Sequence, residues 1–383
     1  MNARGGVLIV TWDGGGNVPP ALALGERLSR AGHRVRVLGP SSISDAAARS
    51  GLPLVPYRTV PPWPEGLRHE DDWERLMVVL NGRPVIDDVL AEVAAARPDV
   101  VVVDCLMGAA LAAAEHAAVP TTALVHVLYR PFAEDWGHRV TDVVGPRAAL
   151  GLEPVDASSL RETLGRVDRV LALTPEGLDV PGDGPPANVE YVGPILGYEA
   201  PVPRPAGARQ ENTVLISFST TLQGQQAALP PVVEAIGRLP VRGLLSLGGA
   251  LRAEDVHAPA NVEVVDYVPH ADVLPGTAAV VCHGGLTTVT TALAFGVPLV
   301  CIPQGREQPL NAERVEACGV GVSVPPDADP PAIAEAVRSV LDDPSYREAA
   351  QRMAAVIGAE GAGDLAARLV EELLRAERVP ARS

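Results

Sequence analysis

Short β-branched runs alternate along the chain with alanine-rich segments of helical composition. In the first half the runs VLIVTW, RVRVLG and DVVVVDCL are each followed by such a segment, for example PALALGERLSRAG after the first run. Nearly continuous Val, Ile and Leu runs are typical of parallel strands whose two faces are both covered by helices. The pattern therefore predicts a doubly wound α/β domain in the first half of the chain.

The second half repeats the pattern after a break in periodicity. Prolines and small residues dominate EAPVPRPAGARQ at 199–210, and strand-like sequence resumes at NTVLISFS. A chain of 383 residues is also longer than one ordinary domain. We predict an α/β fold of two Rossmann-like, doubly wound parallel-sheet domains with a cleft between them. The expected division is a first domain at 1–198, a linker at 199–211, a second domain at 212–365 and a terminal helix at 366–383 that packs back on the first domain.

The strongest chemical signal lies where a strand at 278–282 runs into His283, Gly284 and Gly285, before a helix that we expect to begin near Leu286. Two glycines allow a ligand to approach the backbone closely, and the free N–H groups and positive end of a helix dipole suit a diphosphate. His283 adds a side-chain donor, and further hydroxyl donors follow at the helix start, from Thr287 and Thr288.

A second polar pair follows one strand later. Glu307 and Gln308 stand on a loop that we place at the carboxyl edge of the same sheet. Ligands of open α/β sheets bind at that edge. A carboxylate beside an amide suits the hydroxyl groups of a sugar ring, so the sequence points to a nucleotide-linked sugar as the ligand.

These residues resemble the donor signature of the UDP/TDP-sugar glycosyltransferases with the GT-B fold, particularly the bacterial branch that modifies antibiotics and other natural products. The signature reads roughly H-G-G-x-G-T, A-L-x-x-G-V-P and D-Q-x-x-N-A, and the chain has HGGLTT, ALAFGVP and EQPLNA in the same order. Thr287 stands where glycine is usual and Glu307 where aspartate is usual. We expect both to preserve the donor contacts, with a shift in the α-phosphate geometry at Thr287.

The resemblance extends over nearly the whole chain. VLISFSTT at 214–221 is similar to the first strand and loop of the family's nucleotide domain, which implies that Ser219 and Thr220 line the diphosphate crevice. VVDYVPHADVL at 264–274 resembles the strand whose backbone, here at Val268, holds the base. The resemblance implies an inverting glycosyltransferase that uses a UDP- or TDP-sugar as co-substrate and needs neither a metal nor another cofactor.

The loop after the first strand departs from the family at its catalytic position. The family has G-H-x-x-P there, whose histidine is the general base, whereas this chain reads Gly16-Asn17-Val18-Pro19-Pro20. An amide has no useful proton affinity near neutral pH, so Asn17 can orient an acceptor or a water molecule but cannot take its proton. Either the acceptor is itself acidic or nucleophilic, or another residue acts as base, or the chain is a weakly active binding subunit.

Three residues are candidates for the replacement base: Asp13 in the same loop, His126 at the end of TTALVHV, and Asp104. Asp104 matches the aspartate that orients the family's histidine. It could equally cap the following helix, and a lone histidine at a strand end, such as His126, is often structural.

Aromatic residues are concentrated in the first half. All four tryptophans lie there, in or beside segments that we interpret as loops. This concentration suggests a pocket for a flat, apolar acceptor; its candidate residues are Trp12, Trp63, Trp73, Phe132 and Trp136.

Charge and composition narrow the possible partners. With 31 basic against 47 acidic residues, the formal net charge of −16 argues against nucleic acid. No apolar stretch approaches the length of a membrane span, and the amino terminus lacks a signal-peptide pattern, so we expect a cytoplasmic protein. The four cysteines form no CxxC pair, and capping explains the DxD at Asp327 and Asp329 better than a metal site.

Two other functional classes stay open beside the transferase. Asn17 is compatible with an inactive homologue that serves an active partner, and an NDP-sugar epimerase could share the fold. A nicotinamide dehydrogenase fits poorly, because DGGGN is not G-x-G-x-x-G and the second strand ends without an acidic residue. A homodimer is also left open.

Overall fold

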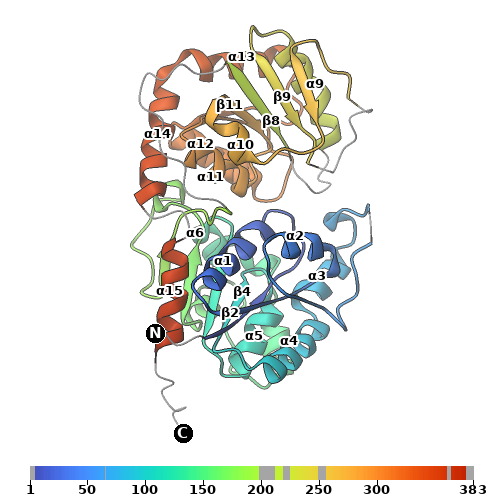
Figure 1. The fold of residues 1–383 in the computed structure, drawn as a ribbon, viewed down its shortest axis with the longest axis vertical. Helices are drawn as coiled ribbons and strands as arrows, with labels where there is room; N and C mark the ends of the chain where they lie inside the picture. Colours follow the sequence, from blue (N-terminus) through green and yellow to red (C-terminus); the bar gives the residue numbers. More distant parts are fainter. Residues whose placement is uncertain are drawn as a thin grey trace.

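The structure, a computed structural model, describes residues 5–64, 66–197, 212–218, 225–248, 256–359 and 364–376. Within these ranges the chain forms two α/β domains, one above the other, each built on a single parallel sheet (Figure 1). The prediction of two doubly wound parallel domains is therefore confirmed. The linker predicted at 199–211 falls outside the described residues. None of the helices within these ranges combines the length and apolar character that crossing a bilayer requires.

The sheet of the first domain has the strand order β3-β2-β1-β4-β5-β6-β7. The order reverses between β1 and β4, and the carboxyl ends of strands at such a point open a crevice for a ligand. The strands are β1 Gly6–Val10, β2 Arg34–Gly39, β3 Leu54–Pro56, β4 Val100–Asp104, β5 Thr121–Val125, β6 Arg169–Ala172 and β7 Val189–Tyr191.

Helices cover both faces of this sheet. They are α1 Val18–Arg30, α2 Ser44–Arg49, α3 Trp73–Asn81, α4 Arg83–Ala96, α5 Gly108–His116, α6 Tyr129–Pro131, α7 Val144–Ala149 and α8 Arg161–Gly165. Short helical turns add η1 Ser41–Ile43, η2 His69–Asp71, η3 Phe132–Trp136, η4 Gly137–Arg139 and η5 Glu176–Leu178.

The second sheet has the order β10-β9-β8-β11-β12-β13 and is also parallel. Its strands are β8 Thr213–Ser217, β9 Arg242–Ser246, β10 Val262–Val265, β11 Thr277–Cys282, β12 Leu299–Cys301 and β13 Gly321–Ser323. The helical segments are α9 Gln225–Gly237, α10 His270–Val273, η7 Leu274–Gly276, α11 Leu286–Ala294, α12 Gln308–Ala317, α13 Pro330–Asp342 and α14 Pro344–Ala359. The last helix of the chain is α15 Asp364–Arg375.

The central strands are apolar on both faces, which explains why their sequences are continuous rather than alternating. Leu8 and Val10 of β1 belong to one core cluster, with Val101 and Val103 of β4. The residues between them, which point to the other face, belong to a second cluster with α1 and α15. Each strand is thus held by two cores, so its carboxyl end is a rigid support for side chains.

Helix α15 lies against the first domain, although it follows the second in sequence (Figure 1). Its buried residues Ala366, Leu369 and Val370 join the apolar cluster of β1 and α1. Ion pairs join its edges to the first domain, Arg27 with Asp364 at 3.3 Å and Arg169 with Glu372 at 2.9 Å, and His33 Nε2 lies 3.4 Å from Glu371 Oε1. The first domain's core is therefore completed by a helix that follows the second domain in sequence.

The two domains also touch near the carboxyl end of the first sheet. Arg314 of α12 donates to the carbonyl oxygen of Leu178 at 3.1 Å, and the thiol of Cys318 contacts the carbonyl oxygen of Gly177 at 3.3 Å. Leu178 is itself buried among residues of the second domain. These contacts join the two domains near the carboxyl end of the first sheet.

We expect Leu369→Ala to destabilise the first domain by about 2–5 kcal/mol, because it removes buried methyl groups and leaves a cavity between α15 and β1. Leu369 is 6% exposed, whereas Val356 on α14 is 45% exposed and serves as the control. Val356→Ala should change stability by less than about 0.5 kcal/mol. The measurement is urea unfolding followed by circular dichroism; equal midpoints for the two variants would show that α15 contributes little.

Candidate active site

A cavity of about 950 Å³ lies between the two domains. Its walls come from the carboxyl-edge loops of both sheets, as the crevice rule for open α/β sheets requires. The first domain contributes Trp12, residues of the 14–20 loop, α3 and His126, and the second contributes the loops before α10, α11 and α12.

Asn17 is the N-cap residue of α1, yet its side chain makes no capping hydrogen bond. A cap side chain normally accepts from the second or third backbone N–H of its helix. Those positions are Pro19 and Pro20, which have no N–H to give. The prolines thereby leave the Asn17 amide available for contacts outside the helix.

The Asn17 amide is instead fully engaged inside the protein. Its Nδ2 donates to Asp104 Oδ2 at 2.7 Å and to the Trp12 carbonyl oxygen at 2.9 Å, while its Oδ1 accepts from the Gly14 N–H at 3.0 Å. Asn17 is 3% exposed. Asn17 therefore holds Asp104 in place; it also lines the cavity, and its role in orienting an acceptor stays a prediction.

Asp104 ends β4, next to the end of β5, where His126 follows. Its Oδ1 lies 3.2 Å from His126 Nε2 and accepts from the Leu106 N–H at 3.0 Å. Burial by itself would raise the pKa of Asp104, but His126, the Leu106 N–H and Asn17 outweigh it and lower that pKa. Asp104 is thus an anion at neutral pH, with both oxygens hydrogen-bonded.

The contact with Asp104 also changes the pKa of His126, which it raises. Burial by itself would lower the pKa of His126, but the charge of Asp104 and the contacts with Cys105 and Asp104 raise it well above its ordinary value of 6.5. The His126 side chain is 14% exposed and lines the cavity. A histidine oriented by a buried carboxylate therefore faces the cleft from a position different from the family's histidine position.

Asp13, the third candidate base, lies elsewhere. Its Oδ2 accepts from the Ser42 hydroxyl at 2.6 Å, and it does not belong to the cavity lining. Among the residues that the structure describes, Asp104, Cys105 and His126 alone bring three possible metal ligands within 4.8 Å of one another. Since hydrogen bonds already join this group internally and to Asn17, we interpret it as a hydrogen-bonded network.

On the opposite wall, the strand-to-helix turn at 283–285 requires both of its glycines. Gly284 has a φ of 81°, and a Cβ there would lie 3.2 Å from the Gln308 carbonyl oxygen. A Cβ on Gly285 would lie 2.4 Å from His283 Nε2. Gly285 is the N-cap of α11, so the free N–H groups of the first turn point at the cavity end that Gly285 and Thr288 line.

His283 is neutral in this environment. Burial, followed by the positive charge of Arg306, lowers the pKa of His283 to about 4, against a smaller opposing hydrogen bond with the Ser217 backbone. The ring is 7% exposed, and its Nδ1 is buried without a hydrogen-bond partner. A neutral imidazole with one unpaired nitrogen beside a helix amino terminus is suited to contact an anionic ligand.

Glu307 and Gln308 have different surroundings. Glu307 is the N-cap of α12, where Pro309 removes one capping partner, and it lines the cavity. Gln308 is 2% exposed and lies outside the lining, because its Oε1 accepts from the Gln304 N–H at 2.8 Å. Asn311 in turn donates to the Gly284 carbonyl oxygen at 2.9 Å. Gln308 and Asn311 therefore brace the two loops at 283–285 and 304–307.

The remaining donor residues divide into three groups. Val268, Thr287 and Thr288 line the cavity. Gly284 lies behind it, and Ser219 and Thr220 fall outside the described residues. The Thr287 hydroxyl donates to the Gly16 carbonyl oxygen at 2.9 Å, so its proton is directed at the first domain. As donor ligands these residues stay predictions.

The aromatic candidates also divide. Trp12, Trp73 and Trp136 line the cavity, with Leu76, Leu80 and Val140 around them. Phe132 is fully buried and packs edge-on against Trp136, with ring centroids 5.2 Å apart. Trp63 packs on His69 at 4.6 Å and stands outside the lining. Phe132 and Trp63 therefore support the pocket from behind and do not form its surface.

The cavity lining also includes residues that the sequence analysis did not single out, among them His69, Tyr267 and Arg306. His69 packs edge-on against Trp12 at 5.2 Å. Tyr267, beside Val268, is 68% exposed and lines the cavity. Arg306 has a φ of 54°, an unusual conformation for a non-glycine residue, and lies next to His283. A basic residue directly before the Glu-Gln pair was the available signal for Arg306.

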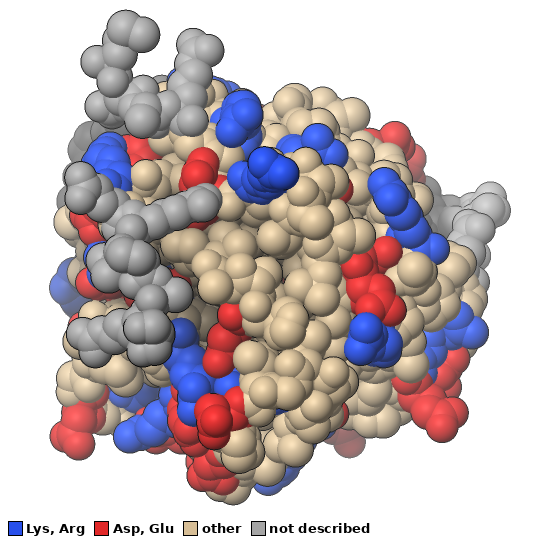
Figure 2. Space-filling model, turned by 90° about the horizontal axis from the view of Figure 1, so that it is seen from below, with Lys and Arg blue, Asp and Glu red and all other residues tan. Residues whose placement is uncertain are grey.

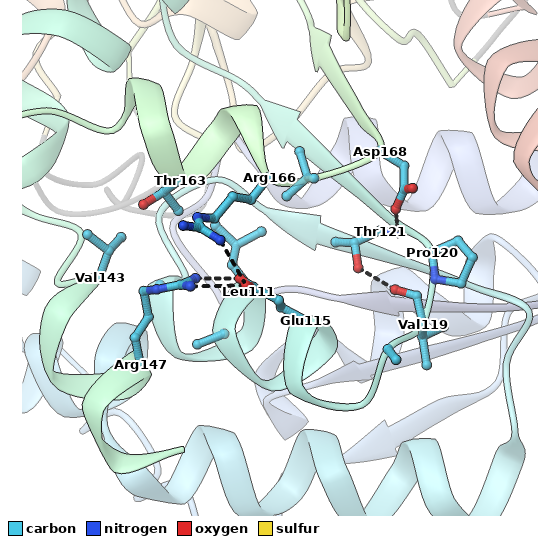
Figure 3. Close-up of a pocket in the computed structure, with 14 residues that line it drawn as sticks. Leu111, Glu115, Val119, Pro120, Thr121, Val143, Arg147, Thr163, Arg166 and Asp168 are labelled. Carbon is cyan, nitrogen blue, oxygen red and sulfur yellow. Dashed lines mark hydrogen bonds and ion pairs between the residues drawn. The ribbon is translucent and has the colours of Figure 1, made fainter. Parts of the chain in front are cut away.

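A second, smaller cavity of about 270 Å³ lies away from the cleft, at the amino ends of β5 and β6 (Figure 3). Arg147 is bonded to both carboxylate oxygens of Glu115, and Arg166 lies 3.8 Å from the same carboxylate. Asp168 accepts from the Thr121 N–H at 2.8 Å. Because these charges neutralise one another, the interdomain cavity is the better candidate site.

The surface adds little to this choice. On the face in Figure 2, basic and acidic side chains are interspersed and form no basic stripe.

The Asp329 side chain caps α13 by accepting from the Ala332 N–H at 2.9 Å, as the capping interpretation predicted. Of the cysteines, Cys105, Cys282 and Cys301 are buried free thiols and Cys318 is half-buried.

Comparison with known proteins gives matches over both domains. Residues 246–373 match the family described as erythromycin biosynthesis protein CIII-like, C-terminal domain. Demethyllactenocin mycarosyltransferase of Streptomyces fradiae is 28% identical over 94% of this chain and 84% of its own. A PGL/p-HBAD biosynthesis glycosyltransferase of Mycobacterium tuberculosis is 34% identical over 48% of this chain. That match spans 43% of the relative's own length, so this chain aligns with less than half of it.

A solved structure agrees with these matches. The glycosyltransferase of kitacinnamycin superposes with a TM-score of 0.76 at 27% identity, covering 97% of this chain and all of that one. The fold and the two-lobed site thus define a GT-B protein. The chain is similar to antibiotic glycosyltransferases over nearly its whole length, which confirms the resemblance based on residues 283–312.

We expect the neutral state of His283 to make the second domain less stable in acid. Its pKa is about 4 in the folded protein and about 6.5 when unfolded, so the unfolded chain binds the extra proton between these values. Stability from this residue is complete above pH 6.5 and falls as the pH drops, by about 2 kcal/mol at pH 5. His283→Gln should remove this slope in urea unfolding from pH 7.5 to 5; parallel curves for the two proteins would contradict the assignment.

Proposed function

We propose that this chain transfers a sugar, with inversion at the anomeric carbon, from a UDP- or TDP-sugar to a small apolar acceptor of natural-product type. One observation carries the proposal: a single interdomain cavity has a helix amino terminus on one wall and a carboxylate-oriented histidine on the other. That the relative matched over most of this chain is named a mycarosyltransferase supports sugar transfer.

The donor would lie against the second domain. In the proposed complex the N–H groups at the start of α11, the His283 ring and the Thr288 hydroxyl receive the diphosphate, and Arg306 adds positive charge beside them. Glu307 is placed to accept hydrogen bonds from the sugar hydroxyls. Because these groups already stabilise the charge that grows on the departing diphosphate, we propose that the reaction needs no metal ion.

The acceptor would lie in the apolar half of the cavity. Trp12, Trp73 and Trp136 provide flat surfaces there, and Leu76 and Leu80 of α3 extend them. Such a wall favours an aromatic or otherwise apolar compound that presents one hydroxyl group to His126.

His126 is the proposed base. The acceptor hydroxyl gives its proton to the imidazole while its oxygen forms a bond to the anomeric carbon. The bond from that carbon to the diphosphate oxygen breaks in the same step, and its electron pair leaves with the nucleoside diphosphate. Asp104 stabilises the imidazolium that forms, and Asn17 keeps Asp104 in position.

A second candidate follows from Asn17. Since every polar atom of its amide contacts the protein, the position that carries the base in the resembled family contributes none here. A chain with no base at all would bind nucleotide and serve as the partner of an active enzyme. Incubation of the purified chain with donor and a panel of phenols separates the two, because a binding subunit yields no glycoside.

We expect His283→Ala to weaken nucleotide binding and to lower turnover at least about tenfold, since it removes a donor from the diphosphate seat. Calorimetric titration with UDP and TDP measures the affinity, and product formation measures the turnover. His257→Ala is the control: the sequence has a histidine there, and it stands outside the cavity lining. Unchanged affinity and rate in His283→Ala would exclude the proposed seat.

The pH dependence of kcat/KM tests the base. A base works only when deprotonated, so the wild-type rate should rise with pH through an apparent pKa well above 6.5, because Asp104 raises the pKa of His126. His126→Gln should remove that limb and lower the rate about 10²- to 10⁴-fold.

Asp104→Asn provides the matched test. Without the anion, the pKa of His126 should fall and the limb should move to lower pH, while the maximal rate drops. If the profile stays in place in both variants, a different group carries the proton and the acceptor's own acidity becomes the better explanation.

A further inference from the structure

One hydrogen bond crosses the cleft between the donor helix and the loop that carries Asn17. The Thr287 hydroxyl, in the first turn of α11, donates to the Gly16 carbonyl oxygen at 2.9 Å. The two residues are 271 positions apart and belong to different domains. Thr287 departs from the resembled donor signature, where glycine is usual and has no hydroxyl to offer.

Gly16 is shaped for this contact. A Cβ on Gly16 would lie 3.2 Å from Thr287 Oγ1 and 3.8 Å from Thr287 Cβ. The absence of a side chain at position 16 therefore lets the threonine reach the backbone without a clash.

The contact continues toward the proposed base. Gly16 precedes Asn17, whose Nδ2 donates to Asp104 at 2.7 Å, and Asp104 lies 3.2 Å from His126. Three hydrogen bonds and one backbone step thus connect the amino end of α11 with the imidazole. A shift of the loop at Gly16 would move Asn17 and, through it, the Asp104–His126 pair.

We infer that Thr287 is a positioning residue: its bond to Gly16 fixes the Asn17 loop against the diphosphate seat and so sets the distance between base and leaving group when the two domains are together. The inference rests on the proposed function. It assigns the Thr287 hydroxyl to the first domain, while Thr288, the next residue in the cavity lining, is left to the diphosphate.

Two consequences follow for catalysis. The nucleotide should bind about equally well without the Thr287 hydroxyl, because that group does not point at it. Transfer should suffer, since a looser loop misplaces the base, and water should reach the donor more often when the domains part. The variant should therefore hydrolyse a larger share of its donor than the wild type.

The kinetic test compares Thr287→Val with Thr287→Ser, which keeps a hydroxyl. Thr287→Val should lower kcat for transfer about 3- to 10-fold, as expected for one lost hydrogen bond, and at least double the share of donor lost to hydrolysis. The affinity for UDP or TDP should stay within about twofold, and Thr287→Ser should restore both readouts.

The matched control is Thr290→Val. The Thr290 hydroxyl lies on the same helix but donates at 2.9 Å to the Leu286 carbonyl oxygen, within α11. This variant should keep the wild-type ratio of transfer to hydrolysis. A Thr287→Val protein with unchanged transfer and hydrolysis, or one with tenfold weaker nucleotide binding and unchanged kcat, would overturn the inference; the latter result would make Thr287 a donor ligand.

A cross-link tests the contact without relying on activity. The 3.8 Å separation between the Thr287 Cβ and a Cβ on Gly16 falls within the range of about 3.5–4.5 Å that a disulfide needs. Gly16→Cys combined with Thr287→Cys should therefore lose two free thiols on mild oxidation, whereas each single variant should lose none.

The oxidised double variant should also be inactive, because a disulfide between the domains prevents the cleft from opening to exchange ligands. Reduction of the disulfide should raise the transfer rate at least about tenfold. Failure of the pair to cross-link would show that the contact does not form in solution. If the pair cross-links but the wild type transfers no sugar to any acceptor, the positional contact stands and the proposed function fails, so the two outcomes are distinguishable.

Discussion

The buried carboxylate of Asp104 is the constraint on which the first domain's side of the cleft depends. A charge that is 4% exposed at the end of β4 must be matched by donors, because burial without them is unfavourable. Here the donors come from three places: the Asn17 amide, the Leu106 N–H and the His126 ring. Compensating one anion therefore fixes the loop after β1 and the end of β5 relative to β4. The family's catalytic position has become part of that compensation.

Proline after a helix cap recurs on both walls of the cleft. Pro19 and Pro20 leave Asn17 without capping partners, and Pro309 takes one from Glu307. In each case a residue that would ordinarily close a helix end extends its side chain elsewhere: Asn17 to a buried carboxylate and Glu307 to the cavity. Absence of a backbone donor thus controls where a functional side chain points.

The parts of the site that could be predicted are those with a local cause. Strand positions follow from β-branched runs, and the turn at 283–285 follows from two glycines between a strand and a helix. The pairing of Asp104 with His126 was open, because a separation of 22 positions in sequence hides the fact that β4 and β5 are neighbours. The roles of Gln308 and Phe132 were also out of reach. A residue type next to a functional segment does not reveal whether its side chain faces the cavity or supports it from behind.

Helix α15 has a further consequence, for the order in which the chain is made. The first domain emerges from the ribosome with its α1 face uncovered, since Ala366, Leu369 and Val370 follow the second domain in sequence and are made after it. That apolar face has to wait until the whole second domain has been translated before its cover arrives. The core of the first domain can therefore be completed only after the second domain has been synthesised.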